Sequence, residues 1–414
     1  MDVLYKVCCG IDVHKKLLVA CIRDGKDSKV MKFGATTKEI GKLAELILSS
    51  GAEKVAMEST ASYWKPVYNI LETRGISCIV VNAQHMKNVP GKKTDVKDSE
   101  WIADLLQHGL LTSSYIPDRN QRDLRELLVY RQSLVQESSA ELNRLQKMLE
   151  GGNIKLSGTV SDILGKSSRL FLENLICGKH LSADDIRKLQ ADGAVSGFLK
   201  ASPEELSDSL DGCLSQMQRE SLRDVMNHID DLSERISATE KRALDSLSDR
   251  QKECVGLLMT VPGIKEISAV CIISVIGTDM SQFPTANHLC SWAGVVPGNN
   301  ESAGKKRSSR CTKGNQLLRA ALSQCANAAA RKKGCFFKAQ YERLVVRRGK
   351  GKAKMAVAHS LLICIYHILK EGIEFKDLGE DYYANYKREA TIRSISRKIK
   401  QLGISKSEIM EMVE

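Results

Sequence analysis

Short apolar runs separated by polar turns follow one another through the first hundred residues. Alternating or wholly apolar runs predict β-strands, whereas apolar residues spaced three and four apart predict helices. We expect strands at residues 5–13, 17–23, 29–34, 54–57 and 78–81, and helices at 37–49, 63–73 and 95–108. Three strands, a helix, then alternating strands and helices predict a mixed sheet flanked by helices, an α/β domain.

From Asn120 the pattern changes to long polar helices that carry a narrow apolar stripe. The first stripe comprises Leu124, Leu128, Val135, Leu142, Leu145 and Leu149, with Arg131 and Ser138 at intervening positions. The second comprises Leu222, Val225, Ile229, Leu232, Ile236, Thr239 and Ala243. Such stripes are typical of coiled coils, formed within one chain or between chains, and also of helices packed on an ordinary core. The pattern leaves these arrangements open.

The remaining residues predict a mainly helical C-terminal domain. An apolar helical run at 254–277 is broken at 261–264, a turn-rich stretch follows at 294–304, and an apolar helix is expected at 355–369. The polar tail after Gly372 is expected to be peripheral. We therefore divide the chain into an α/β domain (1–117), a helical, coiled-coil-like linker (118–250), a helical domain (251–372) and a C-terminal extension (373–414).

Composition narrows the class of protein. The 414 residues, 43% of them hydrophobic, suffice for two or three ordinary cores. No run of about 18 uncharged apolar residues is present, and the N-terminus lacks the layout of a secretory signal. The 13 cysteines include no CxxC pair, so neither a zinc site nor a disulfide framework is expected. We expect a cytoplasmic protein with reduced, buried thiols.

The net charge of +12 comes from one segment. Residues 301–354 hold 16 Lys and Arg against two acids, Glu301 and Glu342, and the rest of the chain has 46 basic and 48 acidic residues. This imbalance favours a polyanionic partner. The basic residues that we expect to contact nucleic-acid phosphates are Lys305, Lys306, Arg307, Arg310, Lys313, Arg331, Lys332, Lys333, Arg347, Arg348, Lys350 and Lys352. The clusters at 331–333 and 347–352 lack interleaved aromatic residues, so stacking on single-stranded bases is not indicated.

Four acidic residues lie at predicted strand ends or at a predicted helix start, where the expected sheet would place them close together. Asp12 ends the first strand in GIDVHKK, and Glu58 ends a later strand in VAMEST. Asp95 and Asp98 lie three apart at the start of a helix, so both are expected on one side of it. Clustered carboxylates repel unless cations neutralise them, and oxygen ligands suit Mg²⁺ or Mn²⁺. Each acid alone is commonplace as a surface charge or helix cap. Together they favour a metal site, with His14 expected as a loop residue and not a ligand.

These segments resemble a family of bacterial insertion-sequence transposases, the bridge-RNA-guided recombinases. GIDVHKK, MESTASYW and KTDVKDSEWIADLL resemble the family's DEDD motif blocks. LLMTVPGIKEISAVCIISVIG and FPTANHLCSWAGVVPGNNESAGKKRSSRCTKGNQLLRAAL are similar to its transposase domain, where a proline precedes a Ser before a small residue and Gly. Here those residues are Pro297 and Ser302-Ala303-Gly304. SDILGKSSRLFLENLICG is similar to the linker of longer members.

The resemblance implies a fold and a mechanism. The first domain would be RuvC-like, that is RNase H-like, with its Mg²⁺ (or Mn²⁺) held by Asp12, Glu58, Asp95 and Asp98. Ser302 would be the nucleophile that forms a covalent serine–DNA intermediate. The implied partners are donor and target DNA, a bridge-type guide RNA and further copies of the chain in a dimer or tetramer. The protein would act at the bacterial nucleoid, away from any membrane.

Other interpretations of the same residues stay open. If the acids activate water and Ser302 is incidental, the protein would be a RuvC-like metal-dependent nuclease acting on DNA junctions. If the carboxylates are structural, it would be a non-catalytic nucleic-acid-binding protein. An actin-like kinase is disfavoured, because no Gly-rich phosphate loop follows the first hairpin. The turn at 261–264 is either a helix–hairpin–helix that meets a phosphate or a plain connection.

Overall fold

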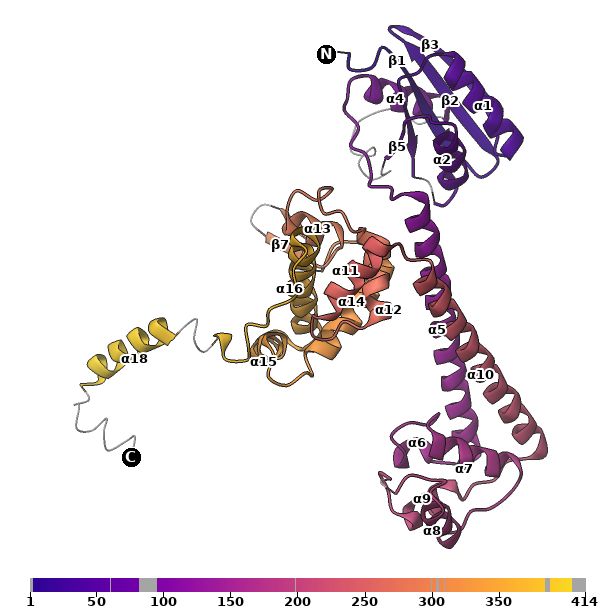
Figure 1. The fold of residues 1–414 in the computed structure, drawn as a ribbon, viewed down its shortest axis with the longest axis vertical. Coiled ribbons are helices and arrows are strands. Elements are labelled where there is room, and N and C mark those ends of the chain that lie inside the picture. Colours follow the sequence, from indigo (N-terminus) through magenta and orange to yellow (C-terminus); the bar gives the residue numbers. More distant parts are fainter. Residues whose placement is uncertain are drawn as a thin grey trace. The chain divides into compact units, whose positions relative to one another are not determined.

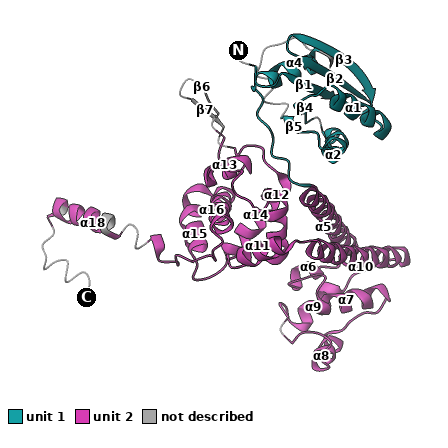
Figure 2. Cartoon of the chain, turned by 45° about the horizontal axis from the view of Figure 1, so that its top comes forward, with its two compact units in different colours: residues 1–118 teal, residues 119–414 magenta. Residues whose placement is uncertain are grey.

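The chain divides into two compact units, which Figures 1 and 2 show in a computed structural model. The structure describes residues 3–59, 61–81, 95–197, 199–298, 300–302, 305–308, 310–383 and 388–403. Unit 1, Met1–Asp118, is an α/β domain. Unit 2, Arg119–Glu414, is helical in its described part apart from one two-stranded hairpin.

Unit 1 is built on a five-stranded mixed sheet with the order β3-β2-β1-β4-β5. β1 (Val7–Val13), β2 (Leu17–Asp24) and β3 (Asp27–Gly34) pair antiparallel, and β4 (Lys54–Glu58) and β5 (Cys78–Val81) add parallel strands beside β1. Parallel neighbours require crossover connections, so α1 (Thr37–Ser49) leads into β4 and α2 (Trp64–Thr73) into β5. The mixed sheet and its elements are therefore confirmed, each to within two residues.

Helices cover both faces of the sheet in unit 1. On one face, Ile11 of β1 joins Leu43 of α1 and Leu71 of α2 in a buried cluster. On the other face, Cys8 of β1 packs with Ile102 of α4 (Asp95–Gln107). Successive side chains of a strand alternate between the two faces of the sheet. The odd-numbered residues of β1, such as Ile11, therefore pack against α1 and α2, whereas Cys8 packs against α4.

Unit 2 begins with two long helices that pair antiparallel within the chain. α5 (Arg119–Gly151) and α10 (Gln216–Asp245) lie side by side (Figure 1), and Arg131 Nε donates to Glu240 Oε1 at 2.6 Å. The apolar stripe of α10 lies on its buried or half-buried side, and that of α5 is shifted slightly, with Leu134 and Glu141 more buried than Val135. Within this chain the two helices pack against each other, and both ends of the pair also contribute to cores, so pairing within the chain and packing on a core are both observed.

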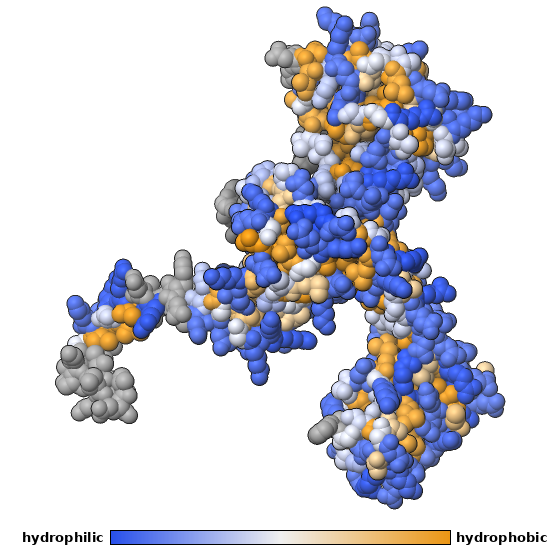
Figure 3. All heavy atoms as spheres, in the orientation of Figure 1, coloured by the Kyte–Doolittle hydropathy of each residue, from blue (hydrophilic) through white to orange (hydrophobic). Residues whose placement is uncertain are grey.

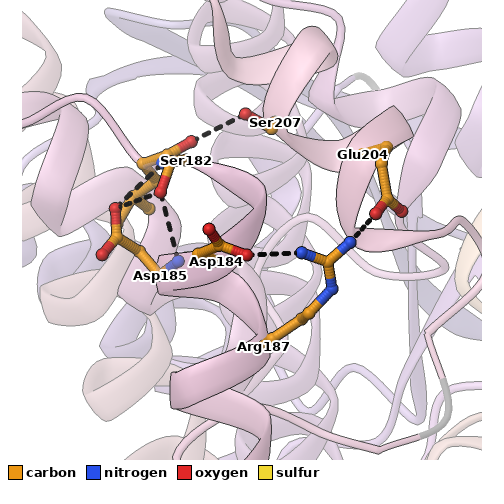
Figure 4. A network of polar contacts seen from close by, with 7 residues as sticks. Ser182, Asp184, Asp185, Arg187, Glu204 and Ser207 are labelled. Atoms are coloured by element: carbon orange, nitrogen blue, oxygen red, sulfur yellow. Dashed lines mark hydrogen bonds and ion pairs between the residues drawn. The ribbon is translucent and has the colours of Figure 1, made fainter.

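A cap of four short helices closes the far end of this pair. The helices are α6 (Leu156–Thr159), α7 (Lys166–Ile176), α8 (Ala183–Ala191) and α9 (Pro203–Leu210), and they share a core with the end of α5 and the start of α10. Ser182 caps α8 by accepting from the Asp185 N–H at 3.2 Å. Arg187 links α8 to α9 by pairing with both Asp184 and Glu204 (Figure 4). The cap is thus a folded subdomain whose core includes the adjoining ends of the two long helices.

The rest of unit 2 forms a second, larger core. Its helices are α11 (Asp249–Met259), α12 (Glu266–Ile276), α13 (Ala286–Trp292), α14 (Gln316–Ala329), α15 (Phe336–Arg348) and α16 (Lys350–Glu371). Leu124 and Leu128 from the start of α5 are part of this core. By length and composition alone, α16 would suffice to cross a membrane. Its residues Val357, Leu361 and Ile365 are buried against the other helices, so its apolar side is used in packing within the chain.

The tail after Gly372, expected to be peripheral, is packed on this core over its first part. The Phe375 N–H donates to Thr260 Oγ1 at 2.9 Å, and the Phe337 and Phe375 rings stack with centroids 5.6 Å apart. The sequence did not indicate this contact, because the apolar residues of the tail are few and aperiodic. Further along, α18 (Arg388–Leu402) carries hydrophobic and hydrophilic side chains on its exposed surface (Figure 3).

Candidate functional site

Asp12 and Glu58 end neighbouring parallel strands at one edge of the sheet in unit 1. In the ladder between β1 and β4, Ile11 lies opposite Met57, so Asp12 and Glu58 occupy the next step of the two strands. Ile11 and Met57 belong to the core beneath α1 and α2. By strand alternation, Asp12 and Glu58 therefore lie on the opposite face, the one that α4 covers. Asp12 is buried, with 5% exposure, and Glu58 is half-buried.

The α4 helix runs antiparallel to β1 and almost touches its backbone. The Cys8 thiol donates to the Ala103 carbonyl at 3.4 Å. A Cβ on Gly10 would lie 2.5 Å from the Ser99 carbonyl oxygen and 2.4 Å from the Ala103 amide nitrogen, distances that no side chain tolerates. Glycine at position 10 is therefore what allows the helix to approach the sheet this closely.

The same approach brings the start of α4 to the edge of the sheet where Asp12 and Glu58 end their strands, here called the acidic edge. Two residues of a strand span about 6.6 Å, and four residues of a helix span about 6 Å. Each step of two residues along β1 therefore corresponds to about one turn of α4. Gly10 lies between Ser99 and Ala103, and the next step of each chain therefore brings Asp12 towards the first turn of α4, which holds Asp95 and Asp98. Asp98 is half-buried in the same first turn, whereas the side chain of Asp95 lies outside the described residues. Among the described side chains, no group of three His, Cys, Asp or Glu is close enough to hold a metal ion.

His14 is a neighbour of this edge whose contact the sequence did not predict. Its Nε2 lies 2.9 Å from Asp12 Oδ2, and its backbone N–H donates to the Leu17 carbonyl at 2.9 Å in the turn between β1 and β2. The expectation of a loop position is thus confirmed. The spacing of the two residues could have indicated this contact. His14 follows Asp12 by two positions, and residues i and i+2 project to the same side of an extended chain.

The thiols of unit 1 are poor competitors for a cation. Burial raises the pKa of Cys8 and that of Cys21 to about 11, and it raises the pKa of Cys78 to about 12. These groups therefore stay protonated at neutral pH, whereas metal binding requires a thiolate. The charged donors that this part of the chain offers are its carboxylates.

Ser302 ends a strand of a hairpin and does not lie in the polar turn that the sequence suggested. β6 (Asn300–Ser302) pairs antiparallel with β7 (Lys305–Ser308), and Ser302 lies opposite Lys305. The side chains of both strands lie outside the described residues. Alternation of Asn, Glu and Ser over three residues is too short a pattern to distinguish a strand from a turn. The side chains of Arg310 and Lys313, just after the hairpin, are exposed.

The base of this hairpin is closely tied to unit 2. The Gly298 N–H donates to the Arg310 carbonyl at 2.9 Å, and Pro297 forms an isolated antiparallel β-bridge with Cys311. Near the start of α14, a Cβ on Gly314 would lie 2.1 Å from the Ala293 carbonyl oxygen. The two chain segments that carry the hairpin are therefore held at a fixed separation.

The basic residues after the hairpin form two separate clusters. The Arg331 cluster (Arg331, Lys332 and Lys333) precedes α15, and the Gly349 corner (Arg347, Arg348, Lys350 and Lys352) spans the end of α15 and the start of α16. All seven side chains are exposed, and none forms an ion pair with a described acid. α15 has 13 residues, which correspond to about 20 Å. The structure therefore does not bring the two clusters together, as a continuous basic segment would have implied.

The turn at 261–264 serves packing between helices. A Cβ on Gly263, whose φ is +86°, would lie 2.5 Å from the Cys325 carbonyl oxygen and 2.6 Å from the Ala329 nitrogen on α14. Val261 and Ile264 on either side are buried. The glycine is thus explained by the close approach of α14 and gives no support to a phosphate-binding turn.

Acids at the ends of parallel strands in one unit and a basic excess in the other favour an enzyme that acts on nucleic acid. Sequence comparison agrees: a transposase model of the DEDD, IS110 type matches residues 9–154, and the model of the transposase IS116/IS110/IS902 family matches residues 255–342. Together they cover more than half of the chain. The chain belongs to this family of transposases.

A curated relative supports the same assignment along most of the chain. The transposase for insertion sequence element IS1111A of Coxiella burnetii (strain RSA 493 / Nine Mile phase I) is 23% identical over 371 residues. The match covers 87% of this chain and 88% of the relative. The protein is therefore a transposase, an enzyme of DNA recombination.

Proposed function

We propose that this transposase cuts and rejoins DNA through a covalent intermediate on Ser302, assisted by an acidic, metal-binding edge in unit 1. The observation that carries the proposal is the convergence of Asp12, Glu58 and the first turn of α4 at one edge of the sheet. Asp12 and Glu58 end adjacent strands although they are far apart in the sequence, and α4 approaches the same face of the sheet.

A RuvC-like, RNase H-like fold for unit 1 is part of the proposal. The order β3-β2-β1-β4-β5, with an antiparallel meander and two parallel strands, supports it. So does the position of the acids, because residues at the carboxyl ends of parallel strands and at the start of a covering helix share one edge. The domain match of the DEDD type is in line with this assignment.

The donor set at this edge fits a hard divalent cation. Asp12, Glu58, Asp95 and Asp98 would hold Mg²⁺ or Mn²⁺, because these residues offer carboxylate oxygens and the thiols of Cys8 and Cys21 in the same sheet are protonated. When bound, the ion would neutralise charge on a phosphate. His14, 2.9 Å from Asp12, would fix the orientation of that carboxylate.

The chemistry assigned to Ser302 is a transesterification. Its hydroxyl oxygen attacks the phosphorus of a DNA phosphodiester, and the bond from phosphorus to the leaving deoxyribose oxygen breaks. The serine proton ends on the leaving oxygen, directly or through solvent. The bond energy is kept in the serine–phosphate ester, so attack by another deoxyribose hydroxyl rejoins strands without ATP. Lys305, Lys306 and Arg307 follow Ser302 in sequence and would stabilise charge on the phosphate.

We further propose a bridge-type guide RNA, donor and target DNA, and several copies of the chain as partners, at the nucleoid in the bacterial cytoplasm. The basic excess of residues 301–354 supports a nucleic-acid partner. Strand exchange between two duplexes requires several cleavages, and one serine per chain then requires several chains.

Mass spectrometry of the protein–DNA adduct tests the proposal. Wild-type protein incubated with its element-end DNA and Mg²⁺, then denatured, should carry DNA on the peptide that contains Ser302. The adduct should be absent in Ser302→Ala, and it should be lost in Asp12→Asn or in EDTA. DNA cleavage by Ser302→Ala at the normal rate, without an adduct, would instead establish the nuclease. Cleavage that EDTA leaves intact would refute the metal site.

A further inference from the structure

The cap of four short helices holds a cavity to which the proposed chemistry gives no role. Its volume is about 540 Å³, within the range of about 300–1,000 Å³ that is typical of small-ligand sites. The end of α7, the segment 179–181 and one side of α8 line this cavity. A concave site of this size with several polar groups is a candidate binding site.

Hydrogen bonds fix the segment 179–181 between α7 and α8. The Lys179 N–H donates to the Asn174 carbonyl at 2.9 Å, where α7 ends. Ser207 Oγ of α9 donates to the Leu181 carbonyl at 3.0 Å (Figure 4). The backbone of this wall is therefore set by the fold of the cap.

α8 supplies a second wall. Asp185, Lys188 and Leu189 are three and four residues apart, so they lie on one side of the helix. Asp185 Oδ2 accepts from the Ser182 N–H at 3.1 Å and from Ser182 Oγ at 2.6 Å (Figure 4). These hydrogen bonds, together with the charge of Lys188, lower the pKa of Asp185. The carboxylate of this wall is therefore used at the start of the helix.

The two lysines of the cavity have no acidic partner. Lys179 and Lys188 are exposed, and neither forms an ion pair with a described acid. Asp184 and Glu204, on the same two helices of the cap, both pair with Arg187 (Figure 4). Lysine ammonium groups form strong, charge-assisted hydrogen bonds with phosphate oxygens. Two lysines that line one cavity therefore favour a ligand with a phosphate group.

The remaining lining suits a base. Leu181 and Leu189 offer apolar surface, and His180 contributes an imidazole ring. Unpaired bases stack on histidine rings and on apolar side chains. Asn174 Nδ2 donates to the Leu170 carbonyl at 2.8 Å, which leaves Asn174 Oδ1 as an acceptor for a base amino group. An inorganic phosphate would leave this part of the cavity unfilled.

We propose that the cavity binds a nucleoside monophosphate, with the phosphate at Lys179 and Lys188 and the base against His180 and Leu189. The nucleotide is either free or an unpaired residue of a strand, and both sources share this chemistry. The choice of ligand rests on the proposed nucleic-acid function. The site uses none of the residues assigned to cleavage, and it gives the cap a binding role.

Photolabelling of the full-length chain tests the site. The probe is 8-azido-AMP, activated by light and located by mass spectrometry, with AMP as competitor. The label should fall on residues 174–189, and AMP should displace it. Adenosine and inorganic phosphate should each compete at least about tenfold more weakly than AMP, because each makes only part of the contacts. Label that falls on residues 301–354 and not on the cap would overturn the proposal.

Matched pairs of lysine substitutions test the phosphate contact. Lys179→Gln with Lys188→Gln should weaken competition by AMP about tenfold or more. Lys147→Gln with Lys166→Gln is the control, because both lysines are exposed on α5 and α7 and neither lines the cavity. The control should stay within about twofold of the wild type. Equal effects of the two pairs, with circular dichroism showing both variants folded, would contradict the site.

Strand probes distinguish the two sources of the nucleotide. If short oligo(dA) or oligo(rA) displaces the label, an unpaired strand supplies the nucleotide, and the more effective strand shows whether it is DNA or RNA. If AMP alone displaces it, the ligand is a free nucleotide. The serine–DNA adduct gives a separate readout of the proposed function. A protein that forms this adduct but takes no label in the cap would overturn the cavity assignment and leave the proposed function standing.

Discussion

At the scale of single residues, Gly10 links packing to the candidate site. Its missing side chain lets α4 lie against β1, and this approach brings the start of α4 towards Asp12. The neighbouring atoms that a side chain would meet belong to the α4 backbone, which cannot rotate away as a flexible side chain can. A residue without functional groups therefore controls the spacing of the acidic edge.

Gly10→Ala should destabilise unit 1 by about 1–3 kcal/mol or more, because overpacking against backbone forces the helix to move. Gly41→Ala is the matched control, since its Cβ would meet only the flexible end of Arg74 at 3.4 Å. Gly41 lies inside α1, so alanine there should be neutral or stabilise by up to about 1 kcal/mol. Denaturant unfolding followed by the fluorescence of Trp64 and Trp101 measures both. Equal effects of the two substitutions would contradict the close approach of α4.

At the scale of elements, α5 and α10 form a hairpin whose two apolar stripes cover each other. The outer side of α10 is polar and appears predominantly hydrophilic in Figure 3. Both stripes are thus used in packing within one chain.

Leu232→Ala, a change at a buried position of α10, should cost about 2–5 kcal/mol, because it leaves a cavity in the seam. The exposed residue Glu234 provides the control, and Glu234→Ala should stay within about 0.5 kcal/mol. The pairing is intrachain, so the thermal midpoint of the helical pair should not depend on protein concentration. A midpoint that rises with concentration would show that the stripes pair between chains.

At the scale of the whole molecule, the two proposed catalytic parts belong to different units. Asp12 lies in unit 1 and Ser302 in unit 2, and each unit has its own core. One chain thus offers one serine and one acidic edge. A recombination that needs several cleavages permits the serine of one copy to act with the acidic edge of another.

Mixing two inactive proteins examines this possibility. A Ser302→Ala chain keeps its acidic edge, and an Asp12→Ala chain keeps its serine, so the mixture should recover part of the recombination activity that neither protein shows alone. The serine–DNA adduct should then appear only on the Asp12→Ala chain. No recovery at any mixing ratio, with both proteins folded and bound to DNA, would mean that each site is completed within one chain.

The sequence by itself determined most of the local structure of this transposase. The strands and helices of unit 1 follow from alternation and from spacings of three and four, since such periods record which side of an element is buried. The stripe of α10 follows for the same reason, and so does the position of Asp12 and Glu58 at strand ends. A pattern of this kind reports burial along one segment and carries no information about which other segment covers it.

Contacts between distant segments decided the rest. Only the register of β1 against β4 makes Asp12 and Glu58 neighbours, and only the direction of α4 brings its first turn to them. Only the fold pairs α5 with α10 inside one chain, forms a strand at Ser302 and brings Phe375 of the C-terminal extension against Phe337 of α15. Each of these depends on pairing free energies between residues tens of positions apart, which composition and local period do not encode. The acidic residues were therefore visible in the sequence, but their common edge came from the tertiary structure.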